Sequence, residues 1–308
     1  MEIYLPIAEQ SMNVFILLGL GGAAGLLSGM FGVGGGFLAT PLLIFVGIPP
    51  AVAVASQANQ VVSNSISSLQ VHWRRGNVDL RMGLVLLLGG MIGSSAGVSL
   101  FTYLKNIGQI DFVIAVLYVV MLSTIGLLML FESARTYIRR RRNPEAPRGK
   151  LHTHYLVHRL PLKLRFYKSK LYISALLPIG IGFAIGILSA ILGVGGGFVL
   201  VPAMIYILGM PTAVVIGTSN FQILFVAANV TFLQAATNGT VDVVLALLLI
   251  LGGVVGAPIG SRIAARLPGV VLRALMAVLV LAVAAELLFD LLRTPPSPFS
   301  LGPREVLP

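Results

Sequence analysis

The chain has 308 residues, of which 57% are hydrophobic and only 10% are charged. Soluble domains carry about 25% charged residues, so this composition excludes an ordinary soluble surface. Cysteine is absent, which excludes disulfides and thiolate chemistry. The formal net charge of +11 would suit a nucleic-acid partner, but its distribution along the chain indicates another role, as described below.

Ten apolar segments follow one another along the chain in two sets of five. The first set lies at about 13–30, 35–47, 51–72, 82–104 and 109–131, and the second at about 172–191, 196–209, 213–237, 242–266 and 270–292. The longest segments reach the roughly 20 residues that a helix needs to cross a bilayer. Backbone groups in lipid must be hydrogen-bonded internally, so we expect an all-α integral membrane protein.

The two sets are copies of one sequence repeat. Equivalent positions are Gly25 and Gly186, Pro41 and Pro202, Gln60 and Gln222, and Asp79 and Asp242. An odd number of crossings per copy turns the second copy upside down, which gives the inverted-topology repeats of many secondary transporters. The first two segments of each copy either cross the membrane or return as a re-entrant hairpin. A re-entrant hairpin would leave three crossings per copy, which is also an odd number. Both cases therefore predict the inversion.

A basic stretch at 133–171 separates the copies. We therefore predict a first membrane repeat at 1–132, a basic linker at 133–171 and a second, inverted repeat at 172–308. With the N-terminus outside, nearly all Arg and Lys residues fall in cytoplasmic loops, as the positive-inside rule requires. This predicts a multi-pass protein of the cell membrane with both termini outside and the linker cytoplasmic. The linker also suits attraction to anionic membrane lipid, and we predict no nucleic-acid partner.

Each copy has a G-V-G-G-G motif inside an apolar segment, where glycine disfavours a continuous helix. We predict helix breaks whose structural residues are Gly32, Pro41, Gly193 and Pro202. A helix that restarts after each break presents free N–H groups, which suit a small anion. The predicted anion-binding glycines are Gly34, Gly35, Gly36, Gly195, Gly196 and Gly197. Close helix packing is the alternative role for membrane glycines, above all for Gly89, Gly93, Gly252 and Gly256.

The third segment of each copy is rich in amide and hydroxyl side chains. Gln57, Gln60 and Asn64 are spaced to lie on one helical face. We predict that the substrate is contacted by Gln57, Asn59, Gln60, Asn64, Ser219, Asn220 and Gln222. Alternatively, the same side chains join neighbouring helices by hydrogen bonds, and the two roles can coexist.

Ionisable residues are scarce within the apolar segments. Asp79, Asp111 and Asp242 stand at segment ends, and no acid pair, Ser-His-Asp set or cluster of metal-ligand residues stands out. We therefore predict a protein that is not an enzyme, with no cofactor and no metal site.

The paired motif G-x-L-S-x-x-x-G-V-G-G-G-F, followed by Pro41 and Pro202, resembles the sulfite exporter TauE/SafE family, a group of anion-permease-like membrane transporters. The second copy departs slightly, with Ala190 where the first has Gly29. The resemblance implies transport of sulfite, sulfoacetate or a related sulfonate. We predict a secondary transporter that exports such an anion by alternating access, with homo-oligomerisation left open. The alternatives are a passive anion channel, an uptake permease for another small anion, and a membrane scaffold or enzyme subunit.

Overall fold

The structure is a computed structural model that describes residues 2–31, 36–142, 162–169, 171–266 and 269–292. The first repeat contains α1 (Val14–Phe31), α2 (Gly36–Phe45), α3 (Pro50–Arg74), α4 (Leu80–Asn106) and α5 (Ile110–Arg142). The second contains α6 (Leu176–Leu192), α7 (Gly197–Tyr206), α8 (Thr212–Leu233), α9 (Val243–Arg266) and α10 (Gly269–Leu292). A π-helical turn, Gln234–Asn238, extends α8. The predicted helical membrane fold is confirmed.

Five helical stretches among the described residues are long and apolar enough to cross a membrane. They are Leu80–Asn106, Ile110–Phe131, Val214–Asn238, Val243–Ile263 and Ala274–Leu292. The helices α1, α2, α6 and α7 are also apolar but shorter. The long helices therefore belong to both repeats, and the short ones are the first two helices of each.

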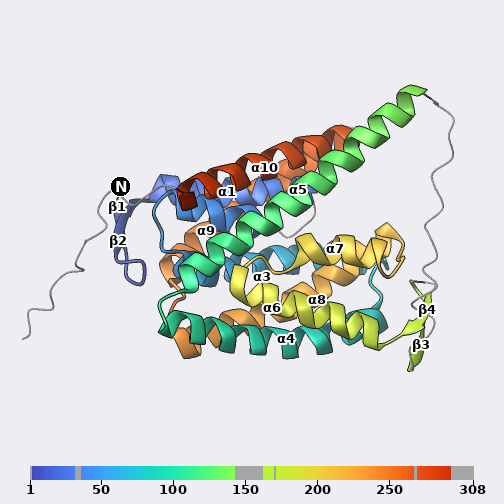
Figure 1. Ribbon diagram of the computed structural model, residues 1–308, viewed down its shortest axis with the longest axis horizontal. Coiled ribbons are helices and arrows are strands. Elements are labelled where there is room, and N and C mark those ends of the chain that lie inside the picture. Colours follow the sequence, from blue (N-terminus) through green and yellow to red (C-terminus); the bar gives the residue numbers. More distant parts are fainter. Residues whose placement is uncertain (1, 32–35, 143–161, 170, 267–268, 293–308) are drawn as a thin grey trace, which may run out of the picture.

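Each repeat also begins with an antiparallel β-hairpin. β1 (Glu2–Leu5) pairs with β2 (Gln10–Asn13) before α1, and β3 (Lys163–Phe166) pairs with β4 (Leu171–Ser174) before α6. The two hairpins lie at opposite ends of the long axis of the molecule (Figure 1).

The repeats interlock, because the first helix of each packs along the fourth helix of the other. α1 lies along α9, α6 lies along α4, and the equivalent pairs α3–α8 and α5–α10 contact each other (Figure 1). α8 begins beside the end of α3, where Gly217 lies against the Asn77 carbonyl. After α8, the Asp242 N–H donates to Ser56 Oγ near the start of α3 at 2.9 Å. α3 and α8 thus run antiparallel, as the predicted inversion requires.

Glycines make the α1–α9 and α4–α6 crossings close. A Cβ built on Gly25 would lie 2.6 Å from Gly253 Cα, and one on Gly186 would lie 2.7 Å from Ser94 N. Real Cβ atoms essentially never approach backbone this closely, so only glycine fits there. Gly89, Gly93, Gly252 and Gly256 likewise face the backbone of the partner helix, as the packing alternative expects.

The flanks of the predicted linker have regular structure. α5 continues to Arg142, and β3 begins at Lys163. Residues 143–161, the middle of the linker, lie outside the described residues. The predicted bounds at 1–132, 133–171 and 172–308 therefore stay a prediction.

Candidate functional site

The glycine motif of the second repeat is a turn between two helices. α6 ends at Leu192 and α7 begins at Gly197, with Pro202 inside α7. Gly193, Gly195 and Gly196 have φ values of +67°, +69° and +74°, in the left-handed region that favours glycine. The turn is buried throughout. A helix therefore starts deep inside the protein, at a point where its first N–H groups face other buried atoms.

The matching motif of the first repeat is only partly described, because Gly32, Gly34 and Gly35 lie outside the described residues. Gly36 is described and begins α2, which contains Pro41. A Cβ on Gly36 would lie 3.1 Å from the Val194 carbonyl oxygen in the opposite turn. Beside it, the rings of Phe37 and Phe198 stack with centroids 4.3 Å apart and planes 4° apart. The two short helices thus start side by side, where the repeats meet.

The polar face of α3 contains a bonded pair of glutamines. Gln57 and Gln60 are fully buried, and Gln57 Nε2 donates to Gln60 Oε1 at 2.7 Å. Gln60 Nε2 donates to the carbonyls of Gly21 in α1 and Leu249 in α9, at 3.1 and 2.9 Å. Gln60 therefore joins two helices, as the packing alternative expects. Asn59 donates weakly to the Ser56 carbonyl at 3.4 Å, and Asn64 is half-buried.

The polar face of α8 is bonded differently. Ser219 Oγ and Asn220 Nδ2 both donate to the Ile216 carbonyl, at 3.0 and 2.8 Å. Gln222, the counterpart of Gln60, is fully buried, yet neither of its amide atoms has a hydrogen-bond partner among the described residues. A buried polar group left unpaired costs about 1–3 kcal/mol. Gln222 therefore has both amide atoms left to offer a ligand, and Gln57 has its buried Oε1, which also lacks a partner among the described residues.

The two hairpins, which the sequence pattern does not predict, pack against opposite ends of the helix bundle (Figure 1). Leu5, the last residue of β1, is fully buried against Leu17, Leu43 and Leu245. Its equivalent at the end of β3, Phe166, is 1% exposed and belongs to a core with Met82 of α4, Met204 of α7 and Val215 of α8. We call Leu5 and Phe166 the plugs. Each plug packs against helices of both repeats.

Each hairpin is tied to a buried aspartate of the opposite repeat. At one end, Asp79 Oδ2 accepts from Ser169 N at 3.0 Å and from Ser169 Oγ at 2.6 Å. At the other end, Asp242 Oδ2 accepts from Ile7 N at 3.0 Å. We call Asp79 and Asp242 the latches.

The latches also fix the helices around them. Asp79 Oδ1 caps α4 by accepting from Met82 N, and Asp242 Oδ1 caps α9 by accepting from Leu245 N, at 3.2 and 3.1 Å. The Asp79 N–H donates to Thr218 Oγ1 of α8 at 3.0 Å, in the same way that the Asp242 N–H donates to Ser56. The sequence repeat matched the two aspartates. The hairpins escaped notice because their equivalent residues differ in type.

The described residues contain no group of three His, Cys, Asp or Glu side chains placed to hold a metal ion. The buried polar side chains are instead amides, hydroxyls and two hydrogen-bonded carboxylates. Such groups can bind and orient a small solute.

Comparisons with known proteins identify the family of the chain. Residues 17–287 match the family model described as sulfite exporter TauE/SafE. A probable membrane transporter protein of Xylella fastidiosa (strain 9a5c) is 30% identical over 256 residues, which cover 82% of this chain and 86% of the relative. The probable membrane transporter protein YjnA of Bacillus subtilis is 29% identical over 283 residues, covering 90% and 100%. No solved structure matches the chain significantly.

Proposed function

Because the chain belongs to the sulfite exporter TauE/SafE family and is therefore a membrane transporter rather than an enzyme, we propose that it exports a small organosulfur anion by alternating access. The substrate is sulfite, sulfoacetate or a related sulfonate. The observation that carries the proposal is the repeated docking of a hairpin on the bundle, through one buried plug and one hydrogen-bonded latch at each end. A carrier needs two such closures, which open in turn.

The inverted repeat supplies the mechanism. A two-fold relation between the halves lets them exchange conformations, so that the site faces each side of the membrane in turn. Opening one end would require its hairpin to leave the bundle and its aspartate to lose the hairpin contact. Opening the linker end, which Asp79 holds, would give the state that faces the cytoplasm. Opening the end that Asp242 holds would give the outward-facing state. Both termini are outside in this proposal, and the basic linker is cytoplasmic.

The anion site lies between the two repeats. Its N–H groups come from the helix starts at Gly34–Gly36 and Gly195–Gly197, and its hydrogen-bonding side chains are Gln57, Asn59, Gln60, Asn64, Ser219, Asn220 and Gln222. Gln222 supports this assignment most directly, because its buried amide lacks a partner among the described residues. The proposed site contains no charged side chain. Uncharged donors bind an anion more weakly than arginine does, which suits a carrier that must release it.

Flux through liposomes that contain the purified protein tests the proposal. We expect saturable exchange and counterflow of at least one of sulfite, sulfoacetate, taurine and thiosulfate. Counterflow separates a carrier from a passive channel, because only a carrier alternates between loaded states. Absence of exchange for all four anions would contradict the substrate class. Normal transport by the Gln57→Ala/Gln222→Ala variant would contradict the site.

A further inference from the structure

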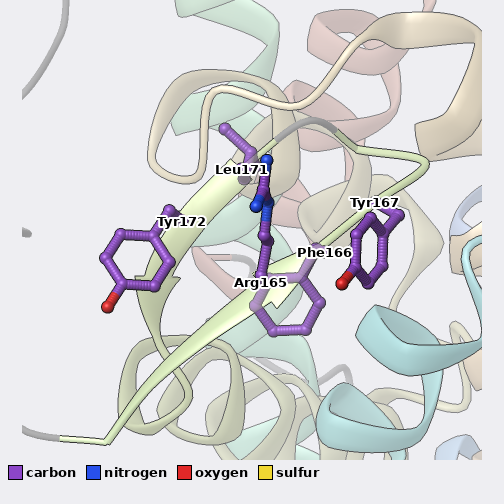
Figure 2. A pocket seen from close by; sticks show the side chains of 5 residues that line it. All are labelled: Arg165, Phe166, Tyr167, Leu171 and Tyr172. Carbon is purple, nitrogen blue, oxygen red and sulfur yellow. The ribbon is translucent and has the colours of Figure 1, made fainter.

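A pocket of about 490 Å³ lies on the β3–β4 hairpin, at the end of the molecule that the Asp79 latch closes. It is lined by Arg165, Phe166, Tyr167, Leu171 and Tyr172 (Figure 2). Phe166 is also the plug of this end. In Figure 2, Arg165 lies between the rings of Tyr172 and Tyr167. The pocket is therefore a concave, positively charged surface directly beside the plug.

Two arginines from different repeats share one of these rings. The Arg165 guanidinium lies 5.6 Å from the centroid of the Tyr167 ring, and the Arg81 guanidinium of α4 lies 5.1 Å from it. Neither arginine forms an ion pair with a carboxylate of the described residues. The ring attracts each cation, but it carries no net charge and so neutralises neither guanidinium. A small oxyanion would supply the missing negative charge, and guanidinium groups match its oxygens well.

At the opposite end of the molecule, the described counterpart positions contain no arginine. The hairpins have the same register, with Glu2 opposite Asn13 and Lys163 opposite Ser174, so Tyr4 is the counterpart of Arg165. By the same register Pro6 is the counterpart of Tyr167. Because Asp242 corresponds to Asp79, Val244 is the counterpart of Arg81. The duplication therefore allows the two ends of one molecule to be compared. Both ends have a plug and a latch, but only the linker end has arginines at the two counterpart positions.

We propose that Arg81, Arg165 and Tyr167 form a loading site, which binds the substrate oxyanion at the linker end before the β3–β4 plug opens. This inference rests on the proposed function and names the place where the exported anion first binds. The anion is collected at the end with the arginines and released at the end without them. With the linker in the cytoplasm, the site lowers the KM for export, and the anion gradient sets the net direction. Arg81 stands two residues after Asp79, in the first turn of α4 that this latch caps.

Binding is tested first, without transport. The thermal unfolding midpoint of the purified protein is measured with sulfite or sulfate, against chloride at equal ionic strength. We expect both oxyanions to raise the midpoint of the wild type, and R81Q/R165Q to lose this shift. R81K/R165K keeps both charges but not the planar guanidinium groups, so it should retain less than half of the shift. R74Q/R75Q, which removes two exposed charges at the same end, should retain it fully.

The transport arm distinguishes this site from the proposed function. In R81Q/R165Q the KM for sulfite on the linker side should rise about fivefold, and the KM on the other side should not change. If the wild type shows the oxyanion shift but moves no sulfite, the site stands and sulfite export fails. If the wild type exports sulfite and R81Q/R165Q matches it in both assays, the loading site is wrong. If R74Q/R75Q loses the oxyanion shift and raises KM as much as R81Q/R165Q does, the effect belongs to the basic loops in general. That result would also overturn the loading site.

Discussion

At the scale of single residues, Gln60 and Gln222 separate structural from functional roles. They are equivalent in the repeat and equally buried, but only Gln60 has hydrogen-bond partners, the Gly21 and Leu249 carbonyls. Removing a satisfied group leaves its partners unpaired, whereas replacing an unsatisfied group by an apolar one of similar size is nearly neutral or stabilising. The pair therefore permits a controlled comparison within one chain.

We predict that Gln60→Leu lowers stability by about 1–3 kcal/mol, because the buried Gln57 amide loses its acceptor and two carbonyls lose their side-chain donor. Gln222→Leu should leave the thermal unfolding midpoint unchanged or raise it, and it should still abolish transport. Unfolding in detergent and flux in liposomes measure the two effects separately. Loss of stability in Gln222→Leu would show that its amide has a structural partner after all.

Gly25 allows a second prediction at this scale. Its Cβ would lie 2.6 Å from Gly253 Cα, so Gly25→Ala forces α1 away from α9. We expect a loss of about 1–3 kcal/mol, as for other overpacked interiors. Gly19→Ala in the same helix is the matched control, because a Cβ at Gly19 would have no other atom within 4 Å. Similar unfolding midpoints for the two variants would contradict close packing at this crossing.

At the scale of elements, the two hairpins are the parts of the fold that the sequence did not predict. Leu5 and Phe166 occupy equivalent places but share no residue type, and four-residue strands leave little periodicity to detect. The helices were easier to predict, because long apolar runs in lipid have few alternatives to helix. The left-handed turn at Gly193–Gly196 was predictable for a related reason, since few residues except glycine adopt positive φ. The helix partners were not predictable, because apolar faces look alike in sequence.

The plugs lead to a prediction about accessibility. The chain has no cysteine, so an introduced cysteine is labelled without background. Phe166→Ala should increase labelling of a cysteine at Val215, which packs in the same core, and leave a cysteine at Leu245 protected. Leu5→Ala should do the reverse. Measured with a membrane-impermeant maleimide, equal labelling at both positions in either variant would mean that the ends do not open separately.

At the scale of the whole molecule, the interlocking of the repeats constrains how the protein can move. α1 belongs to the first repeat but lies along α9, and α6 belongs to the second but lies along α4. Rigid separation of the halves at the linker would break both glycine crossings. The moving bodies should therefore combine helices from both repeats, which the sequence repeat could not reveal.

Orientation is also tested at this scale. Ser11 in β2 and Leu164 in β3 are exposed at opposite ends of the molecule. A cysteine at Ser11 should react with an impermeant reagent in intact cells, and one at Leu164 should react only in inverted vesicles. The basic loops at the Leu164 end predict this result. Labelling of Leu164→Cys in intact cells would reverse the orientation and with it the direction of loading.

The crossing of α1 with α9 has a consequence for biosynthesis. α1 ends at Phe31, but the helix that covers its glycines begins only at Val243. At about 5–20 residues per second, the ribosome needs on the order of 10–40 s to make the intervening chain. During that time the glycine face of α1 has no α9 to pack against in the bilayer. The earliest helix to be inserted is thus among the last to find its place, and we expect it to be the segment most dependent on insertion chaperones.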